Sequence, residues 1–420
     1  MEFFTDTTMV YITLAAVFGI FMAWGIGAND VANAMATSVG SKAITIKQAL
    51  ILAAIFEFAG AYLAGGQVTE TIRKGLVDMS AFDANPEMLV WGMLASLLAA
   101  GTWLLIASMR GWPVSTTHSI VGAIVGFAAV GVGVDAVNWS TVGTTAVSWV
   151  FSPVIAGVVA FLIFMSIQKL VMNTKNPLQN AIKYGPFYLF LVGFVLSLLT
   201  TKKGLKHVGL DLSESMEFVL AVAIGAAIAL VGRILISKVK FDQQAEKRFH
   251  YANVEKIFAV LMVFTASAMA FAHGSNDVAN AVGPMAAVID VAQSGTMAAK
   301  ANVPPWVLLV GAIGIVIGLA TYGYKVIETV GHDITELTPS RGFSAEISTA
   351  MTVVMASYTG IPVSTTHTLV GAILGVGFAR GIAAIDLRVV GGIFMSWVVT
   401  LPAGALLSVM FFYLLRGIFV

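Results

Sequence analysis

Apolar runs of roughly membrane-spanning length follow one another along almost the whole chain. They cover approximately residues 8–28, 43–66, 88–109, 119–134, 142–168, 186–200, 216–236, 257–273, 277–292, 305–327, 346–360, 365–380 and 389–418. The runs 119–134 and 365–380 are short and follow a proline, which indicates re-entrant half-helices that end in mid-membrane. Because one crossing needs about 20 apolar residues, the pattern predicts an all-α polytopic membrane protein with about 12 transmembrane segments, broken helices and re-entrant hairpins.

Composition supports a lipid environment and excludes several kinds of chemistry. The 420 residues are 58% hydrophobic and 11% charged, too few charges for the surface of a soluble protein. A net charge of +1 gives no basic field for nucleic acid. With no cysteine, thiolate metal sites and thiol nucleophiles are excluded. The chain also lacks a nucleotide-binding P-loop and a nucleophile–base pair, so we expect no enzyme and no cofactor.

Two short words recur at nearly one offset, which indicates that the chain is duplicated. GANDVANA at 27–34 returns as GSNDVANA at 274–281, 247 positions later. PVSTTH at 113–118 returns unchanged at 362–367, 249 positions later. We therefore divide the chain into a first transmembrane repeat (1–168), connecting helices with a basic cytoplasmic loop (169–255) and a second transmembrane repeat (256–420).

Loop charges predict that the two repeats enter the membrane from opposite sides. The first repeat begins beside Glu2 and Asp6, without the basic stretch of a cleavable signal, so we expect its first span to be retained. The second repeat begins after the basic segment 238–256, which favours the cytoplasm. The second repeat is thus inverted. Inverted repeats are typical of secondary transporters, whose binding site lies at the repeat interface near the midplane.

Each copy of the longer word carries amide and carboxylate groups inside an apolar run. The residues are Asn29, Asp30, Asn276 and Asp277. A carboxylate in mid-membrane costs about 3 kcal/mol unless it is compensated. Gly27 and Gly274 would permit local unwinding, which frees carbonyls beside these side chains, and such oxygens suit sodium. The alternative is that these groups only hydrogen-bond neighbouring helices. Duplication of the whole word favours an ion site.

The repeated PVSTTH word is typical of a half-helix start that can hold an anion. Proline ends the preceding element, and a serine or threonine can cap the following helix. Free N–H groups and the positive end of the helix dipole attract anions there, and three hydroxyls add donors. The predicted phosphate-binding residues are Ser115, Thr116, Thr117, Ser364, Thr365 and Thr366. The alternative is a polar helix start that packs against its mirror copy.

Four further ionisable residues have two interpretations each. His118 and His367 close the shorter words and could contact substrate or a proton, although a structural role is commoner. Glu57 lies in a long apolar run, where a carboxylate is a coupling candidate, but a protonated structural Glu fits too. Its counterpart in the second repeat is Ile315, so it breaks the pseudo-symmetry. Arg341 could pair with an anion or simply snorkel to the interface.

These words resemble the inorganic phosphate transporter family, whose two signature segments share a Gly-x-Asn-Asp-Val-x-Asn-Ala core. The resemblance implies a sodium- or proton-coupled phosphate symporter with inverted repeats and re-entrant hairpins, and related members carry sulfate. By that resemblance the two Ser-Thr-Thr triplets, 115–117 and 364–366, hold phosphate, and the Asn-Asp pairs at 29–30 and 276–277 hold the coupling ions. Glu57 matches a family carboxylate linked to ion coupling. The short central loop resembles that of prokaryotic members.

The sequence therefore favours an importer of inorganic phosphate with sodium as coupling ion, located in the cell (inner) membrane. The alternatives are a proton-coupled phosphate or sulfate permease and an anion channel. A channel would conduct without a cation gradient, whereas two sites of opposite charge preference on duplicated helices favour coupling. The expected partners are phosphate, sodium and lipid, without nucleic acid, and a homodimer stays open as the assembly.

Overall fold

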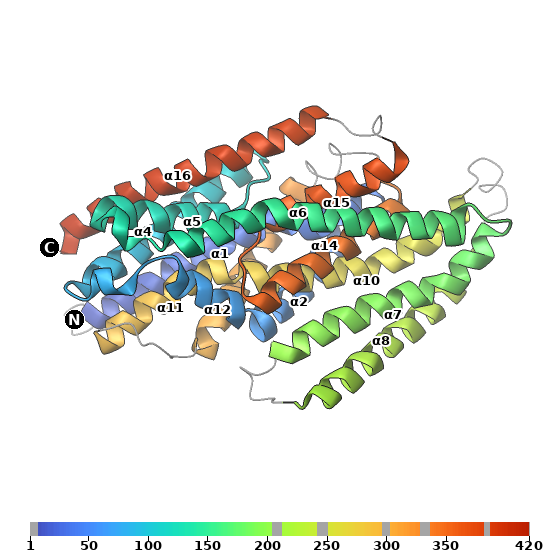
Figure 1. Ribbon diagram of the computed structural model, residues 1–420, viewed down its shortest axis with the longest axis horizontal. Coiled ribbons are helices and arrows are strands. Elements are labelled where there is room, and N and C mark those ends of the chain that lie inside the picture. The colour runs from blue at the N-terminus through green and yellow to red at the C-terminus, as the bar shows by residue number, and fades with distance from the viewer. Residues whose placement is uncertain are drawn as a thin grey trace.

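The computed structural model describes residues 7–203, 212–241, 251–295, 303–327, 337–381 and 387–419, which form one bundle of helices with a common long axis (Figure 1). The longer helices are α1 (Thr7–Gly40), α2 (Ile46–Ala64), α4 (Pro86–Met109), α5 (Thr116–Phe127), α6 (Trp139–Ile167), α7 (Pro177–Lys203), α8 (Glu214–Ser237), α10 (Ala252–Asp277), α11 (Ala279–Ser294), α12 (Pro305–Thr321), α14 (Pro339–Thr359), α15 (Thr365–Arg380) and α16 (Leu387–Phe419). The short elements are α3 (Gly66–Glu70), η2 (Thr71–Gly75), η3 (Met79–Phe82), η4 (Ala128–Val132), η5 (Val134–Ala136) and η6 (Gln168–Met172). Residues 1–6, with Glu2 and Asp6, and 242–250 of the basic segment lie outside the described residues.

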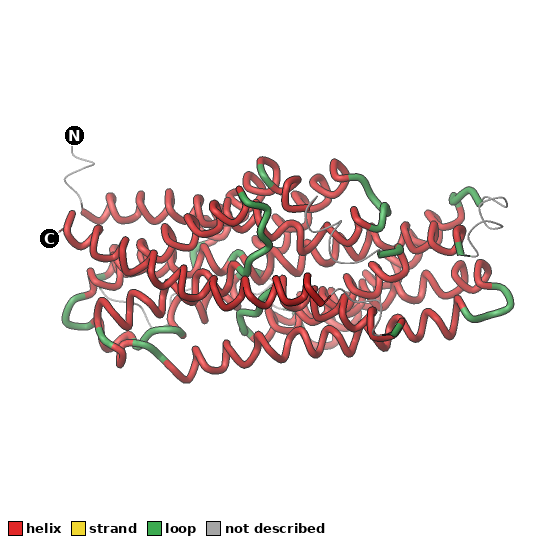
Figure 2. The backbone as a smooth tube through the Cα atoms, turned by 90° about the horizontal axis from the view of Figure 1, so that it is seen from above, coloured by secondary structure: helices red, strands yellow, loops and turns green. Residues whose placement is uncertain are grey.

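The all-α membrane fold is confirmed. Within the described ranges, eight helical segments are long and apolar enough to cross a membrane, and two shorter apolar ones, Thr116–Val132 and Pro305–Thr321, accompany them. α6 shows why the helices suit lipid, because its apolar side chains Val147, Val158 and Leu162 are exposed while Ser152 and Ala156 are buried. Figure 2 shows loops halfway along the bundle as well as at its ends, as re-entrant hairpins require.

The duplicated halves are interlocked. α1 packs along α12 and α10 packs along α2, so each copy of the longer word lies against a helix of the other half. In the same way α5 packs on α16 and α15 packs on α6. α7 and α8, from the unrepeated segment, form an antiparallel pair at the side of the bundle (Figure 1). The two halves therefore share one core and do not form separate lobes.

The two halves run in opposite directions. α1 begins at the end of the bundle that carries the N-terminus, on the left of Figure 1. α10 begins at the opposite end and leads into α11 on the left (Figure 1). The two copies of the longer word are therefore antiparallel, which is the arrangement expected of inverted repeats.

The expected unwinding at Gly27 and Gly274 is wrong. α1 stays helical through its copy of the word, and α10 is interrupted only after Asp277, at the single residue Val278 before α11. Both glycines serve helix packing instead. A Cβ at Gly27 would collide with the carbonyl oxygen of Ile315, and a Cβ at Gly274 with that of Glu57. The missing side chains let α1 approach α12, and α10 approach α2, at backbone distance.

Candidate functional site

Two helical hairpins, α4–α5 and α14–α15, bring the PVSTTH words into the middle of the bundle. Gly360 ends α14 with a φ of 73°, a left-handed conformation that suits glycine after a helix. In each word the proline precedes an extended serine, and that serine caps the next helix. Ser115 Oγ accepts from the N–H of His118 at 3.2 Å, and Ser364 Oγ accepts from that of His367 at 3.3 Å. The predicted half-helix starts are thus present at both positions.

The two hairpins meet through reciprocal hydrogen bonds. Thr117 donates its hydroxyl to the carbonyl of Val363 at 3.0 Å, and Thr366 donates to the carbonyl of Val114 at 3.4 Å. Each triplet therefore contacts the residue that precedes the serine in the other word. The structure brings the six predicted anion-binding residues to one place, all of them buried.

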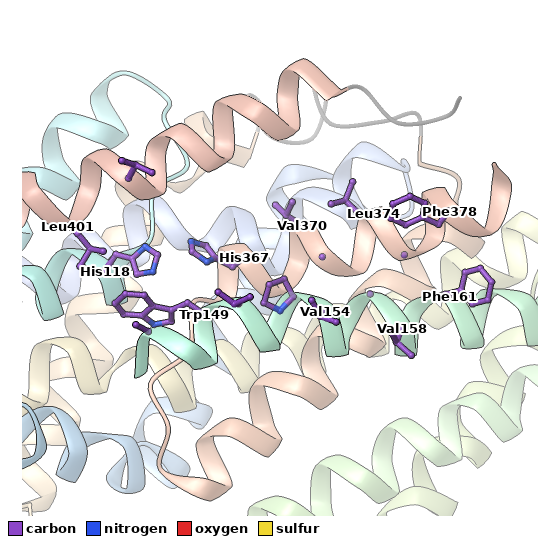
Figure 3. Close-up of a pocket in the computed structure, with 17 residues that line it drawn as sticks. His118, Trp149, Val154, Val158, Phe161, His367, Val370, Leu374, Phe378 and Leu401 are labelled. Atoms are coloured by element: carbon purple, nitrogen blue, oxygen red, sulfur yellow. The ribbon is translucent and has the colours of Figure 1, made fainter. Parts of the chain in front are cut away.

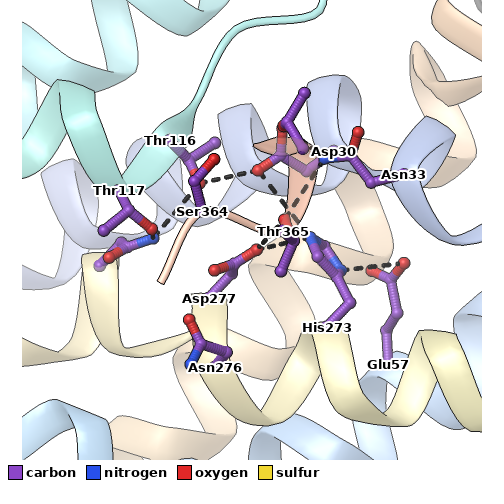
Figure 4. Close-up of polar contacts among 12 residues, drawn as sticks. Asp30, Asn33, Glu57, Thr116, Thr117, His273, Asn276, Asp277, Ser364 and Thr365 are labelled. Carbon is purple, nitrogen blue, oxygen red and sulfur yellow. Dashed lines mark hydrogen bonds and ion pairs between the residues drawn. The ribbon is translucent and has the colours of Figure 1, made fainter. Parts of the chain in front are cut away.

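The predicted cation and anion residues share this place. Thr116 donates its hydroxyl to Asp30 Oδ2 at 2.7 Å, and Thr365 donates to Asp277 Oδ2 at 2.9 Å (Figure 4). The middle residue of each triplet thus bonds the aspartate of its own half. Both carboxylates are buried, with exposed fractions of 1% and 0%. The carboxylates are the groups expected to bind a cation, and the hydroxyls are the groups expected to bind an oxyanion. In this structure the two kinds of group are directly hydrogen-bonded to each other.

The amides of the two Asn-Asp pairs anchor the hairpins. Asn29 Nδ2 donates to Ser108 Oγ at 3.2 Å and to the carbonyl of Trp112 at 2.9 Å, while its Oδ1 accepts from the N–H of Val114 at 3.1 Å. Asn276 contacts Ser357 Oγ at 3.1 Å. The Asn276 amide satisfies its neighbours best with its oxygen toward Ser357, because its nitrogen then donates to Asp277 Oδ1 at 3.1 Å. Both asparagines therefore hydrogen-bond neighbouring elements, as the alternative interpretation of the Asn-Asp pairs expects, and each lies next to its aspartate in the chain.

Two further asparagines in the same words were missed as site residues. Asn33 Nδ2 donates to Thr366 Oγ1 at 2.8 Å. Asn280 Nδ2 lies 3.3 Å from both Thr116 Oγ1 and Thr117 Oγ1. Each asparagine reaches from its own half to the triplet of the other and orients its hydroxyls. The duplication of the whole word, which contains both of them, was the signal that could have identified them.

His273 is a third residue that sequence reasoning missed. Its Nε2 lies 3.0 Å from Asp277 Oδ2 and 3.9 Å from Asp30 Oδ2, and its Nδ1 lies 3.2 Å from Glu57 Oε1 (Figure 4). All four side chains are buried. One donor atom each from Asp30, His273 and Asp277 lie within 4.8 Å of one another, so these residues could hold a cation. Glu57 is therefore linked to the aspartates through the imidazole ring of His273, which lies between them.

His118 and His367 lie side by side at the wall of a cavity. Their rings contact each other edge to face at a centroid distance of 4.4 Å, and the His118 ring lies 3.8 Å from that of Trp149. All three line a largely apolar cavity of about 680 Å3 between α6, α15 and α16 (Figure 3). The structure thus places both histidines at this cavity, in contact with each other, and His118 also in contact with Trp149.

Two other ionisable residues lie away from the triplets. Arg341 is in the first turn of α14 and lines a separate cavity of about 180 Å3 with Arg380 and Glu255. The structure therefore does not bring Arg341 to the anion-binding residues. Glu346, which was not singled out, is buried in α14 and accepts hydroxyl hydrogen bonds from Thr37, Ser38 and Thr265 at 2.5, 2.6 and 2.7 Å. Its partners come from α1 and α10, so no sequence spacing reveals them.

Known proteins share both the sequence and the fold. The profile of a family described as the phosphate transporter family matches residues 26–408. A Haemophilus influenzae protein named "Putative phosphate permease" is 53% identical over all of both chains. The chloroplastic inorganic phosphate transporter 2-1 of Arabidopsis thaliana is 44% identical over 97% of this chain and 72% of its own. A solved structure titled "The sodium-dependent phosphate transporter" has a TM-score of 0.90 and 42% identity, over 98% of this chain and 100% of that one.

Proposed function

The chain belongs to the phosphate transporter family, and from this premise we propose that it is a secondary active symporter that imports inorganic phosphate together with sodium ions. Membership makes the protein a transporter and not an enzyme. The sodium coupling, the direction of transport and the residues that carry them are the proposal. The sodium-dependent transporter that shares the fold supports the choice of ion.

One observation carries the proposal: each aspartate accepts a hydrogen bond from the triplet assigned to phosphate. Asp30 bonds Thr116 and Asp277 bonds Thr365, all four side chains being buried. An anion held by the triplets would therefore lie within a few ångströms of two carboxylates. Like charges repel strongly where water is excluded, so phosphate needs cations between itself and the aspartates. Binding of the two kinds of ion is then mutually dependent, which is the thermodynamic basis of symport.

The triplets suit phosphate because their hydroxyls would supply neutral donors once they turn from their present acceptors. Thr116 and Thr365 now donate to the aspartates, and Thr117 and Thr366 donate to backbone carbonyls. Hydroxyls and helix N-terminal amides bind oxyanions without permanent positive charge. Charge balance at the loaded site then falls to the transported cations, which leave with the anion. Ser115, Thr116 and Thr117 from one half, with Ser364, Thr365 and Thr366 from the other, would surround a tetrahedral ion.

The distribution of charge supports an orientation in the membrane. Lys42 and Lys47 follow α1, and Lys238, Lys240 and Lys256 lie between α8 and the first turn of α10. By the positive-inside rule this end of the bundle faces the cytoplasm, and α1 starts outside. We assign the protein to the cell (inner) membrane, with repeats at 1–168 and 256–420 joined by 169–255.

Uptake into proteoliposomes tests the proposal. Labelled phosphate and labelled sulfate are offered separately, with an inward sodium gradient or an inward proton gradient, and with the membrane potential clamped. The proposal expects concentrative phosphate uptake that only the sodium gradient drives. Uptake driven by protons alone would indicate a proton-coupled permease, and uptake that follows only the phosphate gradient would indicate a channel.

A further inference from the structure

The two halves of the site differ at one pair of positions. In the second half His273 directly precedes the duplicated word, and Ile26 holds the equivalent position in the first half. Glu57 on α2 lies beside that histidine, and the sequence pairs it with Ile315 on α12. An ionisable pair therefore stands where the other half has two buried isoleucines.

Backbone packing supports this correspondence independently of sequence alignment. Gly27 follows Ile26 and packs on the carbonyl of Ile315, while Gly274 packs on the carbonyl of Glu57. Glu57 and Ile315 thus occupy the same place relative to the two words. The difference between the halves is one of side-chain chemistry, within equivalent helix crossings.

The ionisable pair reaches only one aspartate closely. The His273 ring lies between two carboxylates at ion-pair distance, with Nδ1 3.2 Å from Glu57 Oε1 and Nε2 3.0 Å from Asp277 Oδ2. Asp30 Oδ2 lies farther from Nε2, at 3.9 Å. A carboxylate on one nitrogen of an imidazole fixes the ring orientation, and the other nitrogen then fixes its own partner, as in second-shell arrangements around metal ions.

We propose that Glu57 and His273 form a positioning pair that orients the carboxylate of Asp277 and makes the two acidic sites unequal. Glu57 fixes the imidazole, the imidazole fixes Asp277, and Asp277 accepts from the hydroxyl of Thr365. The first half has isoleucine at the equivalent position, and Asp30 accepts from Thr116 at 2.7 Å with His273 Nε2 farther away, at 3.9 Å. This inference rests on the proposed function, because it is tested by the sodium affinity of the protein.

The apolar half supplies the matched substitutions. His273→Ile and Glu57→Ile each install the residue that the first half buries at the same place, so the backbone arrangement already accommodates it. Each variant should raise the sodium concentration for half-maximal uptake roughly fivefold or more, and the double variant should show the same change as either single one, because the pair acts as a unit. The apparent phosphate affinity at saturating sodium should stay unchanged.

Equilibrium measurements keep the test independent of turnover. Sodium-dependent thermal stabilisation of the purified protein should shift to higher sodium in the same three variants. Ile26→Val and Ile315→Val are the controls, and both should follow the wild-type sodium curve. His273→Gln retains a donor toward Asp277, so its effect should be smaller than that of His273→Ile even if the isoleucine variant is poorly folded.

Three results would overturn the inference. They are wild-type sodium curves in both single variants, additive effects in the double variant, and a loss of phosphate affinity with unchanged sodium affinity. If neither the uptake nor the thermal stability of the wild-type protein depends on sodium, the proposed function fails and the inference fails with it. Normal sodium dependence in the wild type and in every variant overturns the inference alone.

Discussion

The hydroxyl of Thr117 donates a hydrogen bond of 3.0 Å to the backbone carbonyl of Val363, 246 positions later in the chain. Its counterpart, from Thr366 to Val114, joins the same two hairpins in the opposite sense. The two triplets are therefore held across the pseudo-symmetry axis by each other's hairpins. A movement of one hairpin must change the environment of both triplets, which is what a site shared by two alternating conformations requires.

The threonine that bridges the hairpins should contribute to phosphate affinity. Thr117→Val or Thr366→Val removes a buried hydroxyl and leaves its carbonyl acceptor unpaired. We expect the apparent affinity for phosphate to fall roughly fivefold or more, since a lost buried hydrogen bond costs about 1 kcal/mol or more. Phosphate titration of uptake at saturating sodium measures this. Thr102→Val is the control, because the Thr102 hydroxyl donates within its own helix, to the carbonyl of Leu98 at 2.7 Å. Equal affinities in all three variants would contradict the assignment.

The capping serines should affect both stability and binding. Ser115→Ala or Ser364→Ala removes the acceptor for the N–H of His118 or His367, which typically costs about 1 kcal/mol. The same substitution removes a donor from the proposed anion site, so phosphate binding should also weaken. Isothermal titration measures the binding, and thermal unfolding measures the capping effect. Unchanged phosphate affinity in both variants, with reduced stability, would leave the serines as helix caps only.

The aspartates should act on sodium first and on phosphate through it. Asp30→Asn or Asp277→Asn keeps the shape of the side chain and removes its charge. We expect the sodium dependence of uptake to shift to higher concentration, and phosphate affinity at fixed sodium to fall as a consequence, because linkage between two ligands is reciprocal. Asp83→Asn, at an exposed position, is the charge-matched control. A normal sodium curve in both site variants would show that the carboxylates are structural.

The residues that precede the triplets should report alternating access. The chain has no native cysteine, so Val114→Cys and Val363→Cys introduce single thiols. Both positions are buried in the described structure, with exposed fractions of 1% and 2%. Water-soluble thiol reagents should label them from opposite sides of the membrane in the two transport states, and phosphate with sodium should protect both. Labelling of both thiols from both sides at once would indicate a channel.

The glycines of the longer words should be intolerant of a methyl group. Gly27→Ala and Gly274→Ala place a Cβ against a backbone carbonyl of the neighbouring helix, which no rotamer change relieves. We expect each to cost roughly 1–3 kcal/mol of stability, as overpacked cores do. Thermal unfolding in detergent measures the loss. Gly143→Ala in α6 meets no atom within 4 Å and should be neutral. An unaffected Gly27→Ala variant would mean that α1 and α12 separate without cost.

Duplicated words made the site predictable, because equivalent words in inverted repeats converge on one interface. The triplets and the aspartates, which the structure brings together, were proposed as site residues in this way. His273 lies one residue outside its word and has no polar counterpart, since the equivalent residue is Ile26. A search for duplicated polar residues therefore does not identify His273. The helix break was misplaced because glycine lowers helix propensity, whereas here α12 and α2 pack on the glycines and stabilise the helices.

The interlocking of the two halves has a consequence for biosynthesis. α5 leaves the ribosome long before α16, on which Gly122 and Gly126 pack at backbone distance. Until α16 has been inserted, the α4–α5 hairpin therefore lacks the helix on which α5 packs, and lipid must cover that surface. A chain that is cut short after α6 contains the α4–α5 hairpin but lacks α16, on which α5 packs, and α15, on which α6 packs. Gene fragments that encode one half should accumulate only when both are expressed together.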